Sequence, residues 1–285
     1  MPNRTCRRPA RIRRSTIYRK EGMKMFAEML PLLVFTTFAG LAAGAYAVDA
    51  LCGNGRAGSG AATPTRPWLF PLVCLVLLGL GLCGTLLHLG QPLRFVNGMA
   101  NPGSMIAQEA YWSIAFGTVI VIDLAVAKAK GSAVRPIRWA GGLVAVGLMV
   151  VTGLAYYQSL GLPAWSGAAT VPLFLVGDLA LGAGLCALLD RSALANGILA
   201  AANVAAGVAL AAVLGAFGLH LARIGLDATE LLVAAGIVGP LAASAVAAAT
   251  RAGKLPAQTG GVAVCVLAIV GVVLARYAFF AAGMM

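Results

Sequence analysis

The chain has 285 residues, of which 60% are hydrophobic and only 11% are charged, and its formal net charge is +12. This composition is too apolar for a soluble globular domain, so it predicts a polytopic membrane protein. The apolar runs have about the 20-residue length that a helix needs to cross the hydrocarbon core, and they do not alternate as the strands of a barrel would. We therefore expect an all-α integral membrane protein.

Eight apolar runs follow one another along the chain. They cover approximately residues 26–51, 69–90, 106–127, 137–158, 171–189, 194–219, 230–250 and 260–284. Glycine occurs 36 times, and small residues let transmembrane helices approach one another closely. The sequence predicts a bundle of eight transmembrane helices that occupies residues 25–285.

A basic arm precedes the first apolar run. Residues 1–24 carry nine Lys and Arg residues, which account for much of the net charge. Our hypothesis is that this arm is not native and that translation starts at Met23 or Met25. Because the charge comes so largely from the arm, it does not indicate nucleic-acid binding, and we expect membrane lipid rather than nucleic acid as a partner.

The distribution of Lys and Arg over the loops predicts the orientation of the chain. Only Arg94 and Arg223 lie in the loops after the second, fourth and sixth helices. The loops after the odd-numbered helices contain Arg56, Arg66, Lys128, Lys130, Arg135, Arg138, Arg191, Arg251 and Lys254. Short cytoplasmic loops carry such an excess, so we expect both termini outside the cytoplasmic membrane, although the basic arm opposes this orientation.

Polar residues gather where the second predicted helix ends. Residues 86–96 read LLHLGQPLRFV and place His88, Gln91 and Arg94 directly after a long apolar run. A loop rich in Gly, Pro and Asn then leads to Glu109 at the start of the third helix. We expect this loop to turn tightly and to bring His88 and Glu109 together on the outer side of the membrane.

Further polar residues are expected on the same side. Tyr156 and Tyr157 end the fourth helix, and His220 and Arg223 follow the sixth. Arg276 lies among apolar neighbours in the eighth helix, and a charge in hydrocarbon is costly unless it has a partner. The sequence offers two buried partners for Arg276, namely Glu109 and Asp178.

Other acidic and aromatic residues have a simpler interpretation. Asp49, Asp123 and Asp190 lie near predicted cytoplasmic helix ends beside basic loops, so we expect them to be charges at the membrane interface. The four tryptophans, Trp68, Trp112, Trp139 and Trp165, also fall near predicted helix ends. Tryptophan is enriched at membrane interfaces, which predicts an aromatic belt.

The inventory of metal ligands is small. The two histidines, His88 and His220, both lie at the outer edge, whereas a haem inside a bundle needs two histidines on facing helices. The six cysteines form no CxxC pair and lie mostly in apolar runs. We expect no haem, no iron–sulfur cluster and no other metal site in this chain.

Four segments resemble the membrane anchor subunits of dimethyl sulfoxide reductase-type molybdoenzymes. They are LHLGQPLRF at residues 87–95, SMIAQEAYWSIAF at 104–116, YQSLGLPAWSGAATVPLF at 157–174 and LARYAFFAAGM at 274–284. Eight helices with both ends outside also agree with that family, and the resemblance extends from Met25 to the end of the chain. One departure is Gln108, where members often have Arg before the Glu.

The resemblance implies a role in anaerobic respiration. Such subunits bind an iron–sulfur subunit and a molybdopterin catalytic subunit, and they oxidise menaquinol, an exchangeable cofactor, on behalf of the complex. By this resemblance His88 and Glu109 are the proton-accepting residues of the quinol site, and Arg94 and Arg276 organise its head-group pocket. Gln91 and Tyr157 complete the expected quinol-binding set. The chain would then be a redox subunit rather than a complete enzyme.

The chemistry of the residues agrees with this reading. Oxidation of a quinol releases two electrons and two protons, so the site needs proton acceptors. Histidine, with an unperturbed pKa of about 6.5, and a partly buried Glu are suited to accept protons near neutral pH. A polar group at the head of an apolar interhelical pocket would receive a lipid-soluble quinol, within tunnelling reach of a docked iron–sulfur subunit.

Two alternatives use the same residues. A small-solute or ion transporter would bind cargo with intramembrane Arg and Asp, and it predicts inverted repeats, broken helices and polar groups on both sides of the membrane. No repeat is visible, and the polar residues are expected on one side only. The second alternative keeps the fold but makes the chain a structural tether without a quinol site.

Overall fold

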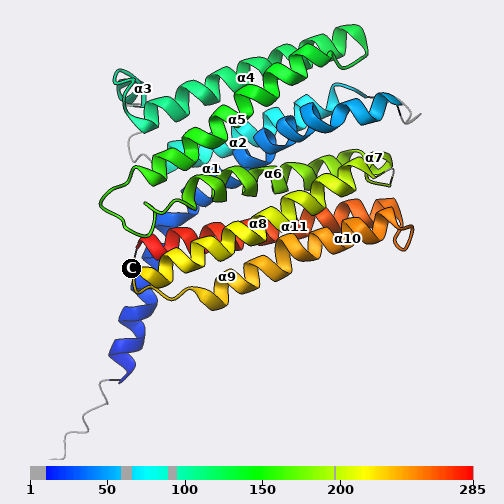
Figure 1. Cartoon of the computed structure of the whole chain (residues 1–285). Coiled ribbons are helices and arrows are strands. Elements are labelled where there is room, and N and C mark those ends of the chain that lie inside the picture. Colours follow the sequence, from blue (N-terminus) through cyan, green and yellow to red (C-terminus); the bar gives the residue numbers. More distant parts are fainter. Residues whose placement is uncertain (1–10, 59–65, 89–94, 196, 285) are drawn as a thin grey trace, which may run out of the picture.

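The computed structural model describes residues 11–58, 66–88, 95–195 and 197–284. The described residues form helices joined by turns and short irregular loops, without a strand (Figure 1). Eight of the helical segments are long and apolar enough to cross a membrane. The predicted all-α polytopic architecture is confirmed.

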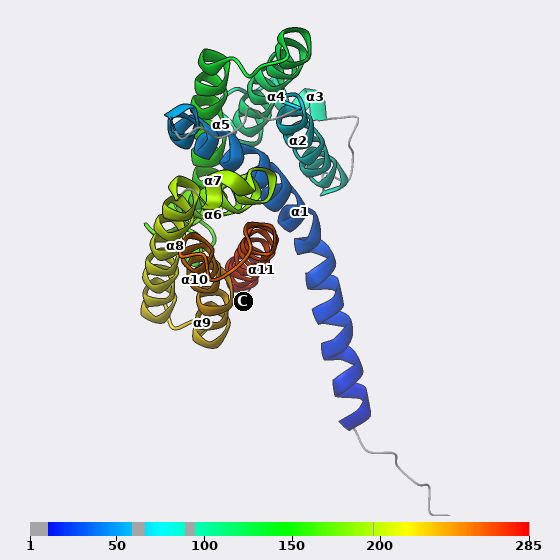
Figure 2. The ribbon, with the colours of Figure 1, turned by 90° about the vertical axis from the view of Figure 1, so that its right-hand side faces the viewer.

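The observed helix bounds follow the predicted apolar runs closely, except that α1 extends beyond both ends of the predicted run 26–51. The first four spans belong to α1 (Arg11–Gly58), α2 (Leu69–His88), α4 (Met105–Lys130) and α5 (Arg135–Tyr157), and the short α3 (Phe95–Met99) precedes α4. The fifth, sixth and eighth spans are α6 (Thr170–Leu189), α8 (Ile198–Arg223) and α11 (Ala257–Gly283). The seventh span consists of three consecutive segments, α9 (Thr229–Gly236), η2 (Ile237–Leu241) and α10 (Ala242–Arg251). The short α7 (Arg191–Ala195) lies between α6 and α8. Helix α1 begins at Arg11, and its first turns project away from the bundle (Figure 2).

Helix α1 lies at the centre of the bundle. It packs against α2 and α5 on one side and against α6 on the other, so it joins two groups of helices (Figure 2). Gly44 on α1 and Gly182 on α6 bring the two backbones into direct contact, because a Cβ atom on either glycine would overlap backbone atoms of the other helix. The absence of side chains at these two positions therefore fixes how closely the two groups approach.

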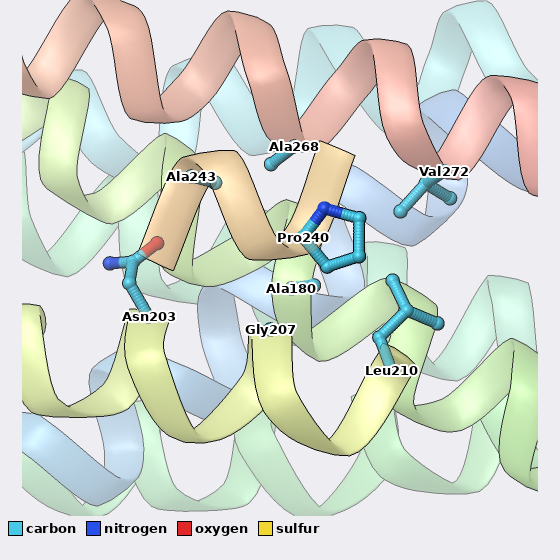
Figure 3. Close-up of a pocket in the computed structure, with 8 residues that line it drawn as sticks. All are labelled: Ala180, Asn203, Gly207, Leu210, Pro240, Ala243, Ala268 and Val272. Carbon is cyan, nitrogen blue, oxygen red and sulfur yellow. The ribbon is translucent and has the colours of Figure 1, made fainter. Parts of the chain in front are cut away.

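The seventh span is broken in its middle by a π-helical segment, η2. Pro240 lies inside it, and a proline has no backbone N–H to continue the helical hydrogen bonds. The Ser244 hydroxyl donates to the Pro240 carbonyl over 2.7 Å, and Gly239 meets Gly271 of α11 backbone to backbone. A small pocket beside Pro240 is lined mostly by apolar side chains, with Asn203 at its edge (Figure 3). The break is thus packed tightly against its neighbours.

Aromatic side chains fill the bundle where α5, α6 and α11 meet. Tyr156, Trp165, Phe174, Phe279 and Phe280 are in mutual ring contact. The Trp165 indole donates to the Phe279 carbonyl over 2.8 Å, and its side chain is buried. Trp165 therefore belongs to the core and not to the expected aromatic belt.

Candidate functional site

The residues of the predicted site come from helix ends that meet on one side of the bundle. The C-terminal ends of α2, α5 and α11 and the N-terminal ends of α4 and α6 all lie at the end of the bundle opposite α7 (Figure 1). His88 is the last residue of α2, although the placement of its side chain is not described. Gln91 and Arg94 lie outside the described residues. The expected pairing of His88 with Glu109 therefore stays a prediction.

Glu109 lies in the second turn of α4. The Ser104 hydroxyl caps this helix by accepting a hydrogen bond from the Ala107 amide over 3.1 Å. The N-terminal end of a helix favours a negative charge, so the carboxylate is well placed there. Its side chain lies near the Thr152 hydroxyl group on α5, and its buried Oε1 atom has no hydrogen-bond partner.

Arg276 is buried within α11, and its partner is Asp178 of α6. The two side chains form an ion pair and are 2% and 3% exposed, respectively. Gly40 of α1 makes room for the pair, because a Cβ atom there would overlap the Asp178 carboxylate. Of the two partners that the sequence offered, the structure selects Asp178 and not Glu109. The buried Nη1 atom of Arg276 has no hydrogen-bond partner.

Tyr156, rather than Tyr157, reaches the interior of the site. Tyr157 is 41% exposed at the end of α5. The ring of Tyr156 is buried and stacks on Phe174 with 4.9 Å between the ring centroids. The Arg276 guanidinium is itself 5.5 Å from the centre of the Phe174 ring.

Thr152 and Tyr156 are the residues of this region that the sequence analysis missed as site residues. They are spaced by four positions and so lie on one face of α5, together with the buried Leu148. The signal available in the sequence was a hydroxyl group on both Thr152 and Tyr156, one helical turn apart on a buried face. The apolar context of α5 concealed it, because a threonine in a transmembrane helix can also bond its own backbone.

A small cavity connects these residues with the ion pair. It lies between α1, α5 and α6 and has room for about one water molecule. Three of its lining side chains are polar, and they are Thr36, Thr152 and Asp178. Glu109, Thr152, the cavity, Asp178 and Arg276 therefore form a continuous polar path, which we call the polar path below. A quinol ring does not fit inside this cavity, so such a ligand would have to bind at the Glu109 end.

The other polar residues expected on this side have different roles. The Nε2 atom of His220 lies 2.9 Å from the Pro163 carbonyl oxygen and ties the end of α8 to the loop between α5 and α6. Arg223 is exposed. Neither residue joins the polar path.

A second polar cluster lies at the opposite end of the bundle. Arg138 of α5 forms ion pairs with Asp49 of α1 and Asp123 of α4, and the Tyr46 hydroxyl donates to Asp123 over 2.8 Å. The guanidinium of Arg138 also lies 4.2 Å from the centre of the Phe70 ring. We call Tyr46, Asp49, Asp123 and Arg138 the inner cluster.

The inner cluster corrects two expectations. Asp49 and Asp123 were expected to be interface charges, but they are 7% and 0% exposed. The expectation of polar groups on one side only is also wrong. Arg138, in the first turn of α5, is itself buried. A buried guanidinium requires a counter-charge, so both carboxylates lie inside the bundle beside it. Asp190 does lie at a helix end, where its carboxylate accepts from the Ala193 amide over 2.9 Å.

The described residues contain no group of three or more His, Cys, Asp or Glu side chains arranged to hold a metal ion. Cys52, Cys74, Cys186 and Cys265 are buried. The ionisable side chains of the polar path and of the inner cluster contact one another or nearby hydroxyl groups.

One family model matches the chain over residues 23–252, and its description is DMSO reductase anchor subunit (DmsC). The matched region contains the first seven spans, including Glu109, Thr152 and Asp178. It ends before α11, so Arg276 and the segment at 274–284 lie outside it. No curated protein matches the chain at a significant level. Because the match covers well over half of the chain, this multi-pass membrane protein belongs to the family of DMSO reductase anchor subunits.

Proposed function

We propose that this anchor subunit binds menaquinol, oxidises it and passes the electrons to an iron–sulfur subunit, which supplies a molybdopterin catalytic subunit in anaerobic respiration. Membership of the family supports the role of an anchor for the catalytic subunits of a DMSO reductase-type complex. The observation that carries the quinol proposal is the polar path, which begins at Glu109 beside the end of α2 and runs into an otherwise apolar bundle.

The surroundings of Glu109 suit a ligand that arrives from the lipid. Ile106 and Tyr111, on either side of it in α4, are 51% and 39% exposed on the outer surface of the bundle. A quinol could approach along this apolar surface and place its hydroxyl group against the carboxylate. The unpartnered Oε1 atom of Glu109 is an acceptor for that hydroxyl group.

The reaction needs two proton acceptors and one route for electrons. Menaquinol loses two protons and two electrons and becomes menaquinone. Glu109 takes one proton, and His88, at the end of the neighbouring helix α2, takes the other. The electrons leave to the iron–sulfur subunit docked outside the membrane, as the expected orientation of the chain requires.

A transporter is the weaker interpretation of the same structure. The break at Pro240 and the inner cluster are features that a transporter could share. However, the pocket beside Pro240 is mainly apolar, and the carboxylates of the inner cluster are already paired with Arg138. Membership of the anchor family favours the quinol proposal further.

The proposal is tested by Glu109→Gln and His88→Ala in the complete complex. Each variant should assemble normally, yet menaquinol-dependent turnover should fall by roughly 100-fold or more, as expected when a proton acceptor is lost. Glu230→Gln is the matched control, because Glu230 is an exposed carboxylate at the same end of the bundle, on α9. It should leave turnover unchanged.

Binding is measured separately by the fluorescence quenching of a hydroxyquinoline oxide, a quinol analogue. The wild-type complex should quench it stoichiometrically, and the His88→Ala variant should not. Normal quinol oxidation in both site variants would refute the assignment. A wild-type complex that assembles but neither binds the analogue nor oxidises quinol would be a structural tether.

A further inference from the structure

The cavity beside Asp178 is built to hold a water molecule. A buried water needs enough space and two to four polar partners. The side chains of Thr36, Thr152 and Asp178 line the cavity from three different helices. The Thr36 hydroxyl donates to the Leu32 carbonyl over 2.8 Å, so its oxygen remains available as an acceptor.

Unsatisfied polar atoms lie at both ends of the polar path. The Oε1 atom of Glu109 at one end and the Nη1 atom of Arg276 at the other are buried without a hydrogen-bond partner. Buried polar groups are nearly always paired, with protein or with water. These atoms therefore mark both ends of the path as places where a water molecule or a ligand hydroxyl group is stabilised.

We propose that Thr152, a water molecule in this cavity and Asp178 form a relay that carries a proton from Glu109 into the bundle. This inference rests on the proposed quinol oxidation, which supplies the proton. Arg276 is a positioning residue, because its ion pair holds the Asp178 carboxylate at the far side of the cavity.

Each step of the relay exchanges one O–H bond for another. The proton on Glu109 moves to the Thr152 oxygen, while the hydroxyl proton of Thr152 moves to the water. The water in turn gives a proton to the Asp178 carboxylate. No electron moves in these steps, and the Glu109 carboxylate is regenerated for the next quinol.

The charged group that contacts Asp178 among the described residues is Arg276 on α11. From α5 it is faced by the Thr152 hydroxyl, and from α1 by Gly40 and Thr36, which carry no charge. Tyr156 is not among the residues that line the cavity. The relay thus has one acceptor beyond Glu109, and Thr152 is the link that can be removed without changing any charge.

Thr152→Val is the decisive variant because it replaces the hydroxyl group by a methyl group of similar size. In the complete complex it should bind the hydroxyquinoline oxide within about twofold of wild type, while quinol-dependent turnover falls roughly tenfold or more, the loss of a proton-transfer step. The kinetic isotope effect of D₂O on turnover should increase. Thr152→Ser should restore the rate.

Ser113→Ala is the matched control. Ser113 is a buried hydroxyl one turn deeper on α4 than Glu109, it has no hydrogen-bond partner, and it does not line the cavity. Its removal should leave both turnover and the isotope effect unchanged. If Thr152→Val behaves like Ser113→Ala while the wild type oxidises quinol, the relay is refuted and the proposed function stands. If the wild type does not oxidise quinol, both the relay and the proposed function are refuted.

Infrared difference spectra test Asp178 directly. Addition of menaquinol to the wild-type complex should produce a protonated-carboxyl band that shifts in D₂O. Asp178→Asn alone leaves Arg276 buried without a counter-charge, so the double variant Asp178→Asn/Arg276→Gln is used to remove both charges together. In the double variant the proton stays on Glu109, so the band should change its frequency, whereas Glu230→Gln should leave the band unchanged. An identical band in the wild type and the double variant would overturn the role of Asp178.

Discussion

Arg138 shows how a single buried charge organises its surroundings. Its guanidinium lies between Asp49 and Asp123, and Phe70 and Tyr46 cover it with their rings. The three charged residues come from α1, α4 and α5, so the inner cluster joins three helices. Each group alone would be costly in hydrocarbon, and the cluster is tolerated because the charges are shared.

Replacement of Arg138 by Met should therefore destabilise the protein. It leaves two carboxylates buried without their guanidinium, and breaking a buried pair costs about 3–5 kcal/mol. The free energy of unfolding of the purified protein in mixed micelles, measured by denaturant titration, checks this value. Arg191→Met is the control, because Arg191 is exposed and should change stability little.

A double variant separates charge from packing at the same place. Arg138→Met combined with Asp123→Leu removes an anion together with the cation, so it should recover part of the stability lost in the single variant. Equal stability of Arg138→Met and wild type would contradict the view that the inner cluster holds α1, α4 and α5 together.

At the scale of elements, the crossing of α1 and α6 determines the geometry of the bundle. Gly44 and Gly182 allow the two backbones to touch, and the same close approach places Asp178 next to Gly40. The ion pair of Asp178 with Arg276 and the cavity beside Thr152 both depend on this spacing. A glycine pair without any polar side chain thus supports the polar path.

A methyl group at this crossing should disturb it. Gly44→Ala inserts a Cβ atom into the Asp178 carbonyl group, and overpacking of this kind costs about 1–3 kcal/mol. Gly215→Ala on α8 is the matched control, since no atom lies within 4 Å of the new Cβ atom and alanine is the better helix former. Denaturant unfolding should show a loss for the first variant and none for the second. The opposite order would contradict the assigned contact.

At the scale of the whole molecule, two groups of helices lie on either side of α1 and α6 (Figure 2). Buried ion pairs lie toward each end of the bundle. The polar path opens toward one end, beside Glu109, and the inner cluster closes the other. This asymmetry agrees with the proposed quinol site at one end of the bundle.

The loop charges predict the orientation of the chain, and labelling checks this prediction. A cysteine introduced at Asn101, in the exposed turn between α3 and α4, should react with an impermeant maleimide in intact spheroplasts. A cysteine at Ser132, in the exposed turn between α4 and α5, should react only after the membrane is permeabilised. The parent chain gives the background labelling, and the reversed pattern would contradict the orientation predicted from Lys and Arg.

Much of the fold was determined by the sequence alone. The length and order of the apolar runs predicted all eight spans, because crossing a membrane requires a local stretch of apolar residues. The ends of α4 also follow from local chemistry, with Ser104 as its N-cap and Gly131 in the left-handed conformation at its C-cap. The need of Arg276 for a buried partner was likewise evident from its neighbours in the chain.

The tertiary structure decided the identity of the partners. Asp178 lies 98 residues from Arg276 in the sequence, and the Arg138 pair with Asp49 spans 89 residues. Which of several carboxylates meets a given arginine depends on how each helix is rotated and how closely it packs, and a uniformly apolar helix leaves that rotation undetermined. For the same reason only the structure distinguished Tyr156 from Tyr157 and placed Thr152 between Glu109 and the ion pair.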